Sequence, residues 1–185
     1  IALAIFKHHA LQAELLGTTI ITSSGEEIDQ ATAFYAWRPV LRQLFGDGID
    51  AEEKLLEFVA NDPWLDERRG LLAPMVSVGV QDSDLIAGME PELRGENTLR
   101  LLTAIVRGAP RASGPFVIVI DDAHWVDSAS WAMAERAVRE IPALLLVIAN
   151  RPFGEGSGRN APLEYERLIA DQGTEHVVLT ELEPA

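Results

Sequence analysis

Hydrophobic and polar positions along the chain follow two kinds of pattern. Short runs that are continuously apolar or β-branched predict strands, whereas apolar residues three or four positions apart predict helices. The predicted strands are Thr18–Ser23, Phe116–Ile120, Ala143–Ala149 and His176–Thr180. The second and third of these runs contain no alternating polar residue, which is typical of strands buried on both faces. We therefore expect an α/β fold with a parallel sheet covered by helices.

Helical spacing fills most of the chain between the predicted strands. Helices are expected at 1–16, 35–45, 51–60, 92–107, 129–140 and 163–171, with a looser one at 64–73. The long helix at 92–107 would place Leu93 on its apolar side, and Pro74–Gly88, which has no clear period, is expected to be a loop. Because 24–114 is too long for a single crossover, we expect a mainly helical insertion there and the rest of the sheet in 115–185.

The charge of the chain excludes several kinds of partner. Its 185 residues include 15 Lys and Arg against 29 Asp and Glu, a formal net charge of −14. Such an acidic surface repels phosphate backbones and anionic headgroups, so we expect no direct contact with nucleic acid or with a membrane. The longest apolar run, Pro142–Ala149, is far shorter than the roughly 20 residues that span a bilayer. The chain has no cysteine, which fits a reducing compartment, and we expect a cytoplasmic location.

Candidate chemistry follows the predicted strand Phe116–Ile120. Asp121 and Asp122 come directly after this buried run, and ligands of open parallel sheets bind beyond the carboxyl ends of the strands. Adjacent carboxylates at such a position need a cation or hydrogen bonds to compensate them. Since successive side chains point in different directions, one carboxylate could hold Mg²⁺ while the other faces a water molecule. The alternative is a solvated turn with capping carboxylates.

Several segments together resemble one family. The segment PFVIVIDDAHWVDSASW at 115–131 looks like the Walker B region of P-loop ATPases of the signal-transduction (STAND) type. These ATPases occur in multidomain bacterial adenylate/guanylate cyclases and in large LuxR-type transcription regulators. ATAFYAWRPVLRQLFG at 31–46, PELRGENTLRLLTAIV at 91–106 and LLLVIANRP at 144–152 resemble further segments of the same domain in the same order.

The resemblance implies a role for each matching residue. Asp121 corresponds to the Walker B aspartate that coordinates Mg²⁺, and Asp122 to the acidic residue that polarises the attacking water. Arg151 corresponds to the sensor of the γ-phosphate, with Asn150 as the alternative holder of that role. The implied cofactors are ATP and Mg²⁺. The implied function is an ATP-hydrolysing switch that controls effector domains of the same parent chain, cyclase or DNA-binding, and that could form a nucleotide-dependent oligomer.

The family's phosphate loop is a departure from this pattern. No G-x-x-x-x-G-K-[ST] motif occurs in the sequence, whose only lysines are Lys7 and Lys54. In the family, this loop and the strand before it precede the first helix, so both would lie upstream of Ile1. We therefore expect a partial ATPase domain over 1–185, missing its N-terminal strand, which would lie between the strands at 143 and 176. By itself it should bind ATP negligibly and be poorly folded or self-associated.

Other residues have plainer interpretations. Asp127 or Ser128 is expected to cap the helix at 129–140, while His124 and Trp125 are expected to pack the turn against that helix. Arg94 is expected to form a surface ion pair or to reach a ligand or partner. The pair His8 and His9 cannot face one metal from adjacent helical positions, and the glycines at 154–158 suit a surface loop.

A different function also fits part of the sequence. The chain could be a non-catalytic scaffold derived from such an ATPase, with the helical insertion as its interaction surface. The adjacent aspartates favour the ATPase, since a scaffold needs neither carboxylate. A phosphoacceptor receiver domain also gathers aspartates at strand ends, but it requires a lysine near its last strand, and no lysine follows Lys54.

Overall fold

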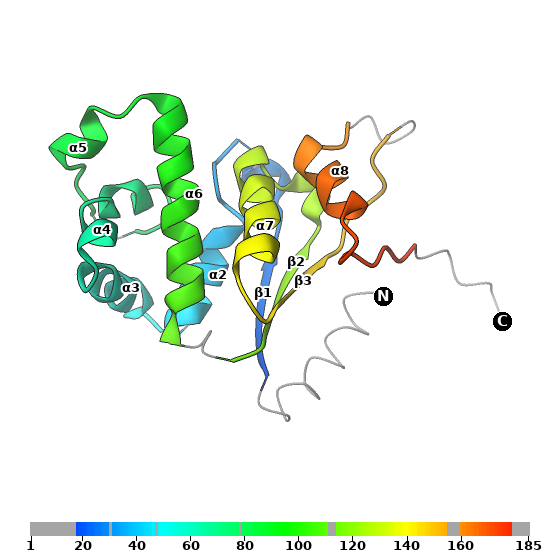
Figure 1. Cartoon of the computed structure of the whole chain (residues 1–185), viewed down its shortest axis with the longest axis horizontal. Coiled ribbons are helices and arrows are strands. Elements are labelled where there is room, and N and C mark those ends of the chain that lie inside the picture. The colour runs from blue at the N-terminus through cyan, green and yellow to red at the C-terminus, as the bar shows by residue number, and fades with distance from the viewer. Residues whose placement is uncertain are drawn as a thin grey trace.

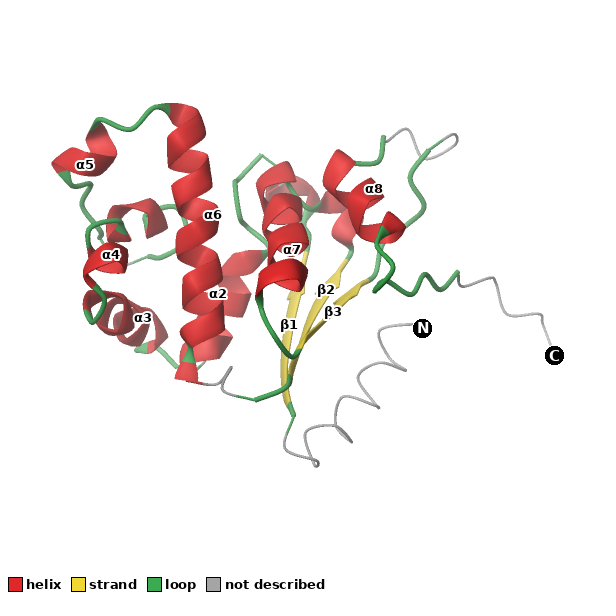
Figure 2. Cartoon of the chain, in the orientation of Figure 1, coloured by secondary structure: helices red, strands yellow, loops and turns green. Residues whose placement is uncertain are grey.

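A computed structural model describes residues 18–29, 31–46, 48–77, 79–110, 114–154 and 160–178 (Figure 1). The helix expected at 1–16, with His8 and His9, and most of the glycine-rich loop lie outside these residues. Within them, helices surround a small parallel sheet (Figure 2), which confirms the predicted α/β class.

The sheet contains β1 (Thr19–Ser24), β2 (Phe116–Asp121) and β3 (Leu144–Ile148) in the order β1-β2-β3, all parallel. Ile118 of the central strand is level with Ile21 on one side and with Leu146 on the other. β2 is the most buried strand because it has a neighbour on each side, and this burial explains its unbroken apolar run. The carboxyl ends of all three strands therefore meet at one edge.

The helices are α2 (Trp37–Phe45), α3 (Ala51–Ala60), α4 (Pro63–Asp66), α5 (Asp84–Ala87), α6 (Pro91–Gly108), α7 (Ser128–Glu140) and α8 (Leu163–Ala170), with 3-10 turns at Glu27–Asp29, Arg69–Leu72 and Ala123–Trp125. In Figure 1, α6 stands between α7 and the shorter insertion helices α3 to α5. One hydrophobic cluster joins these helices to the sheet. Among the helices of the described residues, none is both long and apolar enough to span a bilayer.

The first insertion helix also covers an edge of the sheet. α2 buries Trp37, Val40, Leu41 and Leu44 and packs against β1. From the same helix, the Gln43 amide accepts from the Thr22 N–H at 3.0 Å and donates to the Thr22 carbonyl oxygen at 2.8 Å. A side chain thus satisfies the backbone groups that an edge strand leaves unpaired.

Two expectations for the insertion were wrong in detail. The helix expected at 64–73 is instead α4 followed by the 3-10 turn Arg69–Leu72. Gly70 lies in this turn and packs so closely that a Cβ would lie 2.9 Å from the Gln81 carbonyl oxygen. The stretch 74–88 is not entirely loop, because it contains α5, whose first turn is capped by the Ser83 hydroxyl.

Two exposed segments also differ from expectation. Leu93 is 53% exposed rather than buried, because the first turns of α6 extend beyond neighbouring helices and the buried face starts at Thr98. The strand predicted at His176–Thr180 does not form over 176–178, and Val177 and Val178 are exposed there. A β-branched run becomes a strand only when it pairs with a neighbour, and 176–178 does not pair with β3. The residues 179–180 lie outside the described part.

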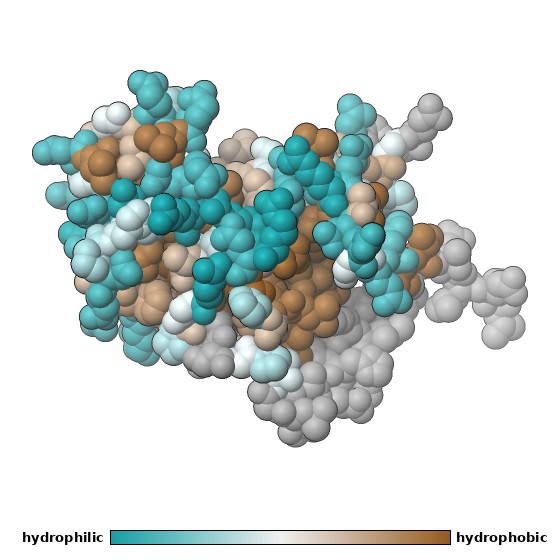
Figure 3. All heavy atoms as spheres, in the orientation of Figure 1, coloured by the Kyte–Doolittle hydropathy of each residue, from teal (hydrophilic) through white to brown (hydrophobic). Residues whose placement is uncertain are grey.

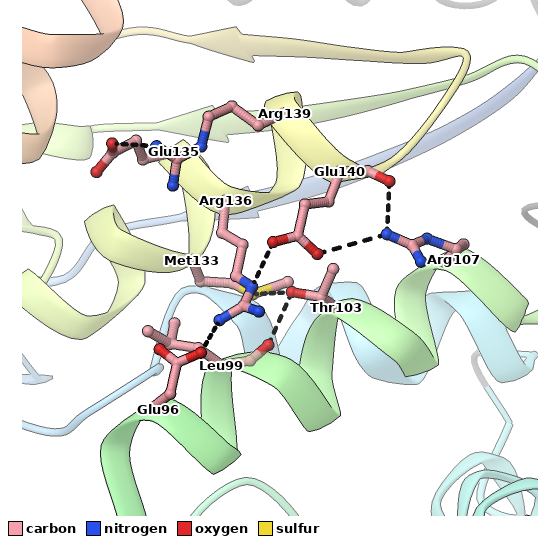
Figure 4. A network of polar contacts seen from close by, with 9 residues as sticks. All are labelled: Glu96, Leu99, Thr103, Arg107, Met133, Glu135, Arg136, Arg139 and Glu140. Atoms are coloured by element: carbon pink, nitrogen blue, oxygen red, sulfur yellow. Dashed lines mark hydrogen bonds and ion pairs between the residues drawn. The ribbon is translucent and has the colours of Figure 1, made fainter. Parts of the chain in front are cut away.

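The helical insertion meets the sheet layer at an ion network between α6 and α7 (Figure 4). Arg136 of α7 contacts Glu96 of α6 at 2.7 Å and Glu140 at 2.8 Å, while Arg107 of α6 donates to the Glu140 carbonyl oxygen at 2.7 Å. Partial burial by itself lowers the pKa of Arg136. The hydrogen bond and charge of Glu96 and the charge of Glu140 outweigh it, so this pKa is raised. We call Glu96, Arg107, Arg136 and Glu140 the α6–α7 network.

The surface is also divided into a hydrophilic and a hydrophobic region. Figure 3 shows hydrophilic side chains over α6 and α7, and hydrophobic ones gathered in the region of β3. Leu145 of β3 is 58% exposed, whereas no residue of β2 is fully exposed. In the part of the chain that the structure describes, β3 has a paired neighbour only on its β2 side.

Candidate functional site

The turn that follows β2, residues 121–126, forms the centre of the candidate site, and we call it the acid turn. Asp121 is the last residue of β2, partly buried and level with Ser24 of β1. Asp122 has a left-handed backbone conformation, with φ 47° and ψ 37°, and its side chain is 56% exposed. This conformation is uncommon outside glycine, and Asp and Asn are among the residues that tolerate it best. The adjacent carboxylates therefore occupy different environments.

Backbone hydrogen bonds hold the acid turn from both neighbouring strands. The Gly25 N–H, just after β1, donates to the Asp121 carbonyl oxygen at 2.9 Å, and the Ala123 N–H donates to the Ala149 carbonyl oxygen, just after β3, at 2.9 Å. Asp121 Oδ1 also accepts the N–H of Asp122 at 2.9 Å. The conformation at Asp122 is thus fixed by contacts on either side of it.

Gly25 lies directly against this turn. A Cβ on Gly25 would be 2.7 Å from the Asp122 carbonyl oxygen and 3.1 Å from Cβ of Trp125. Real Cβ atoms do not approach backbone so closely, so only glycine allows the segment after β1 to pack here. Gly25 is a residue of the candidate site that the sequence pattern did not single out.

His124 and Trp125 complete the turn as a short 3-10 helix. His124 is buried, its ring centroid lies 5.1 Å from that of Trp125, and its Nδ1 lies 3.9 Å from Asp122 Oδ1. The burial of the ring agrees with the expectation that His124 serves packing. Asp122 Oδ1 is thus within ion-pairing distance of a protonated His124, and the Asp122 side chain is otherwise 56% exposed.

The end of β3 brings the other predicted residues to the same edge. Ile148 is level with Ile120, so Asn150 and Arg151 leave the sheet beside the acid turn. Asn150 Nδ2 donates to the Arg151 carbonyl oxygen at 2.8 Å, and Arg151 is exposed. Among the described residues, no hydrogen bond or ion pair joins Arg151 to a carboxylate, including Asp121 and Asp122. The structure therefore brings all four predicted residues to one edge without contacts between the arginine and the acidic pair.

The donor set at the acid turn is compatible with Mg²⁺. This cation is usually bound by one or two carboxylates together with water and substrate phosphate oxygens, rather than by an all-protein cage. Asp121 provides one partly buried carboxylate. In the described part of the chain, no group of three or more His, Asp or Glu side chains is placed to hold a metal ion by itself. A Mg²⁺ ion here would therefore take Asp121 and the oxygens of a bound phosphate.

Asp127, the residue that follows the acid turn, is the N-cap of α7. It is buried and accepts from the Ser130 N–H at 2.8 Å. Of the alternatives Asp127 and Ser128, the structure selects Asp127. Arg94 also has the plainer of its predicted roles, because it forms an ion pair with Asp82 at 2.8 Å.

A comparison with protein families bears on this geometry. A family model described as AAA ATPase domain matches residues 2–148. The chain belongs to this family. Comparisons with curated proteins and with solved structures gave no significant match.

Membership of the AAA ATPase domain family confirms a P-loop ATPase-type domain and agrees with the parallel sheet. In this AAA ATPase domain the match includes the acid turn, with Asp121 and Asp122, but ends at Ile148. Asn150 and Arg151 therefore lie just beyond the matched part. These two residues remain candidates for the γ-phosphate sensor because they follow β3 at the edge of the sheet and because Arg151 is positively charged.

Proposed function

We propose that this AAA ATPase domain is a Mg²⁺-dependent, ATP-hydrolysing switch in a signalling or regulatory protein. One observation carries the proposal. Asp121 and Asp122 stand side by side at the carboxyl end of the central strand, held by backbone hydrogen bonds from both neighbouring strands, and without an ion pair to any described Lys or Arg. Uncompensated carboxylates in a rigid setting are suited to a cation and a water molecule supplied with the substrate.

The different environments of the two carboxylates suggest different roles. Asp121, partly buried at the strand end, would hold the Mg²⁺ that neutralises charge on the ATP phosphates. Asp122, more exposed and turned by its left-handed backbone, would accept a hydrogen bond from the attacking water and align it with the γ-phosphorus. The oxygen of that water would bond to the γ-phosphorus as the bond between this phosphorus and the bridging oxygen of ADP breaks, and one proton of the water would pass to an oxygen of the phosphate product.

The role proposed for Arg151 follows from its position at this edge and from the absence of a carboxylate partner among the described residues. In a chain of net charge −14, most described arginines pair with a carboxylate, for example Arg136, Arg94 and Arg139. Arg151 does not, although it lies at the edge where the acid turn ends. An exposed guanidinium at this position can bind the γ-phosphate and stabilise charge that develops during transfer. Asn150 is the alternative sensor.

The remaining parts of the proposal depend on the resemblance to STAND-type ATPases. The switch would control effector domains of the same parent chain, of the cyclase or DNA-binding kind, in the cytoplasm, and could form an oligomer that depends on nucleotide.

The decisive experiment compares three variants of the full-length natural chain. Asp122→Asn should leave Mg-ATP binding nearly unchanged but slow hydrolysis by roughly 10²- to 10⁴-fold, as expected for loss of a residue that activates water. Asp121→Ala should weaken Mg²⁺-dependent nucleotide binding. Asp66→Asn, which removes an exposed carboxylate of the insertion, is the control and should change neither.

Binding is measured by titration calorimetry and hydrolysis by phosphate release. Hydrolysis at the parental rate in both site variants would show that the acid turn is not the catalytic site. If the parent chain binds ATP without hydrolysing it, or binds none, the scaffold function replaces the proposed one.

A further inference from the structure

Asp127, the residue directly after the acid turn, does more than cap α7. It is 8% exposed, and its oxygens accept from the Ser130 N–H at 2.8 Å, the Ser130 hydroxyl at 2.6 Å and the Phe34 N–H at 3.1 Å. Phe34 lies 93 positions earlier, in the segment that leads into α2. A buried carboxylate is stable only when its oxygens are satisfied in this way, and one of its donors comes from the helical insertion.

A second hydrogen bond joins the same two places. Trp37, the first residue of α2, is fully buried, and its Nε1 donates to the Ser130 carbonyl oxygen at 3.0 Å. Phe34 itself has φ 60°, a backbone conformation that bulky residues rarely adopt. Its N–H is held in place by Asp127. We call Phe34, Trp37, Asp127 and Ser130 the α2–α7 latch.

The latch is continuous with the acid turn. The Trp125 N–H donates to the Asp122 carbonyl oxygen at 2.9 Å, and the Val126 N–H donates to the Ala123 carbonyl oxygen at 3.0 Å. The backbone between Asp122 and Asp127 is therefore short and held by hydrogen bonds. At its other end the turn is fixed by β2 and Gly25. A shift of α2 relative to α7 must therefore either break buried hydrogen bonds of the latch or move the acid turn.

An ordinary helix cap elsewhere in the chain provides a comparison. Asp62 caps α4 by accepting the N–H groups of Trp64 and Leu65, both of its own helix. Asp62 is exposed, and within the described part of the chain its side chain accepts no hydrogen bond from a distant segment. Capping thus needs no donor from far along the chain, and the bond from Phe34 to Asp127 requires another explanation.

We propose that Asp127 is a positioning residue for ATP hydrolysis, through which the packing of the helical insertion sets the position of the acid turn. The inference rests on the function proposed above. It also gives the insertion a regulatory role: a domain or partner that displaces the start of α2 changes the hydrolysis rate through the latch. The chemistry stays with the acid turn, and Asp127 does not contact the substrate.

The kinetic test uses the full-length natural chain under conditions where every variant is folded. Asp127→Ala should lower kcat by about tenfold or more with KM nearly unchanged, because the acid turn loses its alignment. Asp127→Asn should retain most of kcat, since an amide oxygen can accept both N–H groups while the Ser130 hydroxyl turns to accept from Nδ2. Asp62→Ala is the matched control and should leave kcat unchanged. A parental kcat in folded Asp127→Ala would overturn the proposal.

A second measurement does not depend on activity. Amide hydrogen exchange in Asp127→Ala should accelerate over 31–37 and 121–126 as well as at the start of α7, whereas in Asp62→Ala it should accelerate only around α4. Acceleration confined to 128–131 would show that Asp127 is merely a cap, and would overturn the inference. If Asp127→Ala does not fold, Trp37→Phe decides the matter by the same readout, because it removes the Nε1 donor and retains an aromatic ring.

Asp122→Asn, measured in parallel, separates the two proposals. If it hydrolyses ATP at the parental rate, the proposed site is wrong whatever Asp127 does, and the exchange data still decide whether the latch controls the turn. If Asp122→Asn is slow and Asp127→Ala is fast, only the positioning role fails.

Discussion

The acid turn and the α6–α7 network both contain charged groups beside the core. They differ in whether those charges are paired with charges of opposite sign. In the network, Arg136 has a 16% exposed side chain and contacts both Glu96 and Glu140. In the acid turn, Asp121 and Asp122 have backbone contacts and no described Lys or Arg partner. Arg136 thus neutralises both glutamates within the protein, whereas the acidic pair has no described Lys or Arg to neutralise it, and Asp122 Oδ1 lies 3.9 Å from His124 Nδ1. The comparison thus contrasts a charge cluster that is satisfied within the fold with the acidic pair that we propose to be functional.

Among changes that leave the carboxylates of the acid turn intact, the largest effect is expected from moving that turn. In Gly25→Ala the new Cβ would meet the Asp122 carbonyl oxygen at 2.7 Å, so the turn must shift. A displacement of this kind should slow ATP hydrolysis by the full-length chain about 10²-fold. Gly95→Ala, on an open part of α6 with nothing within 4 Å, is the control. It should leave hydrolysis unchanged and stabilise the fold by about 0.5–1 kcal/mol. Equal rates in both variants would mean that the turn needs no fixed geometry.

The network should respond in stability rather than in activity. Arg136→Met leaves Glu96 and Glu140 facing each other, and should lower the free energy of unfolding by about 1–2 kcal/mol, a range limited by the exposure of both glutamates. Urea denaturation measures this loss. Arg139→Met removes the exposed partner of Glu135, which keeps its contact with Arg167, and should change stability by less than about 0.5 kcal/mol. A large fall in kcat in Arg136→Met would mean that the network also serves catalysis.

A substitution in the acid turn should affect activity rather than stability. Asp122→Asn removes a charge that has no described Lys or Arg partner, and asparagine tolerates the left-handed backbone at least as well as aspartate. The free energy of unfolding should therefore stay within about 0.5 kcal/mol of the parental value or increase. A loss comparable to that of Arg136→Met would identify Asp122 as part of a structural ion pair.

The smallest effect concerns an exposed pair outside both regions. The hydrogen bond from Lys54 at 2.6 Å lowers the pKa of Asp50 below its ordinary value of 3.8. Because the folded-state pKa is depressed, any stability that the pair contributes is present above pH 3.8 and is lost as the pH falls through the folded-state pKa. Lys54→Met should return this pKa toward 3.8 without a measurable change in unfolding at neutral pH.

Carboxyl NMR titration measures the shift at Asp50, and high salt should shift the parental pKa in the same direction. A pKa that stays low in Lys54→Met would assign the shift to the backbone at Asp50 rather than to the ammonium group.

Much of the fold could be predicted because local patterns determine it. β2 and β3 were recognisable from unbroken apolar runs, and α2, α3, α6 and α7 from helical spacing, to within a residue or two at each end. The acid turn was placed correctly because parallel strands end at a common edge. The strand predicted at 176–180 shows the limit of this reasoning. Its β-branched residues favour a strand, but only a paired neighbour forms one.

The contacts that define the site were harder to predict because they join segments distant in sequence. Nothing in the pattern around Gly25 indicates that it packs against Asp122, and nothing around Phe34 indicates a hydrogen bond to Asp127. Gly25 could have been found from the expected register, since it follows the strand that pairs with β2. The donor to Asp127 could not, because the path of the insertion back to α7 depends on packing.

The amino-acid sequence was enough to establish the class of fold, the position of the acidic pair at a strand end and the membership of an ATPase family. These properties depend on local periodicity and on adjacent residues, which need no knowledge of distant partners. The structure was needed to show that Gln43 hydrogen-bonds the N–H and carbonyl of Thr22 at the edge of β1, that Asp127 takes a donor from the insertion and that Arg151 contacts no carboxylate among the described residues. Each of these depends on which surfaces meet when the insertion folds back onto the sheet, and burial makes such meetings specific because a buried polar group must find a partner.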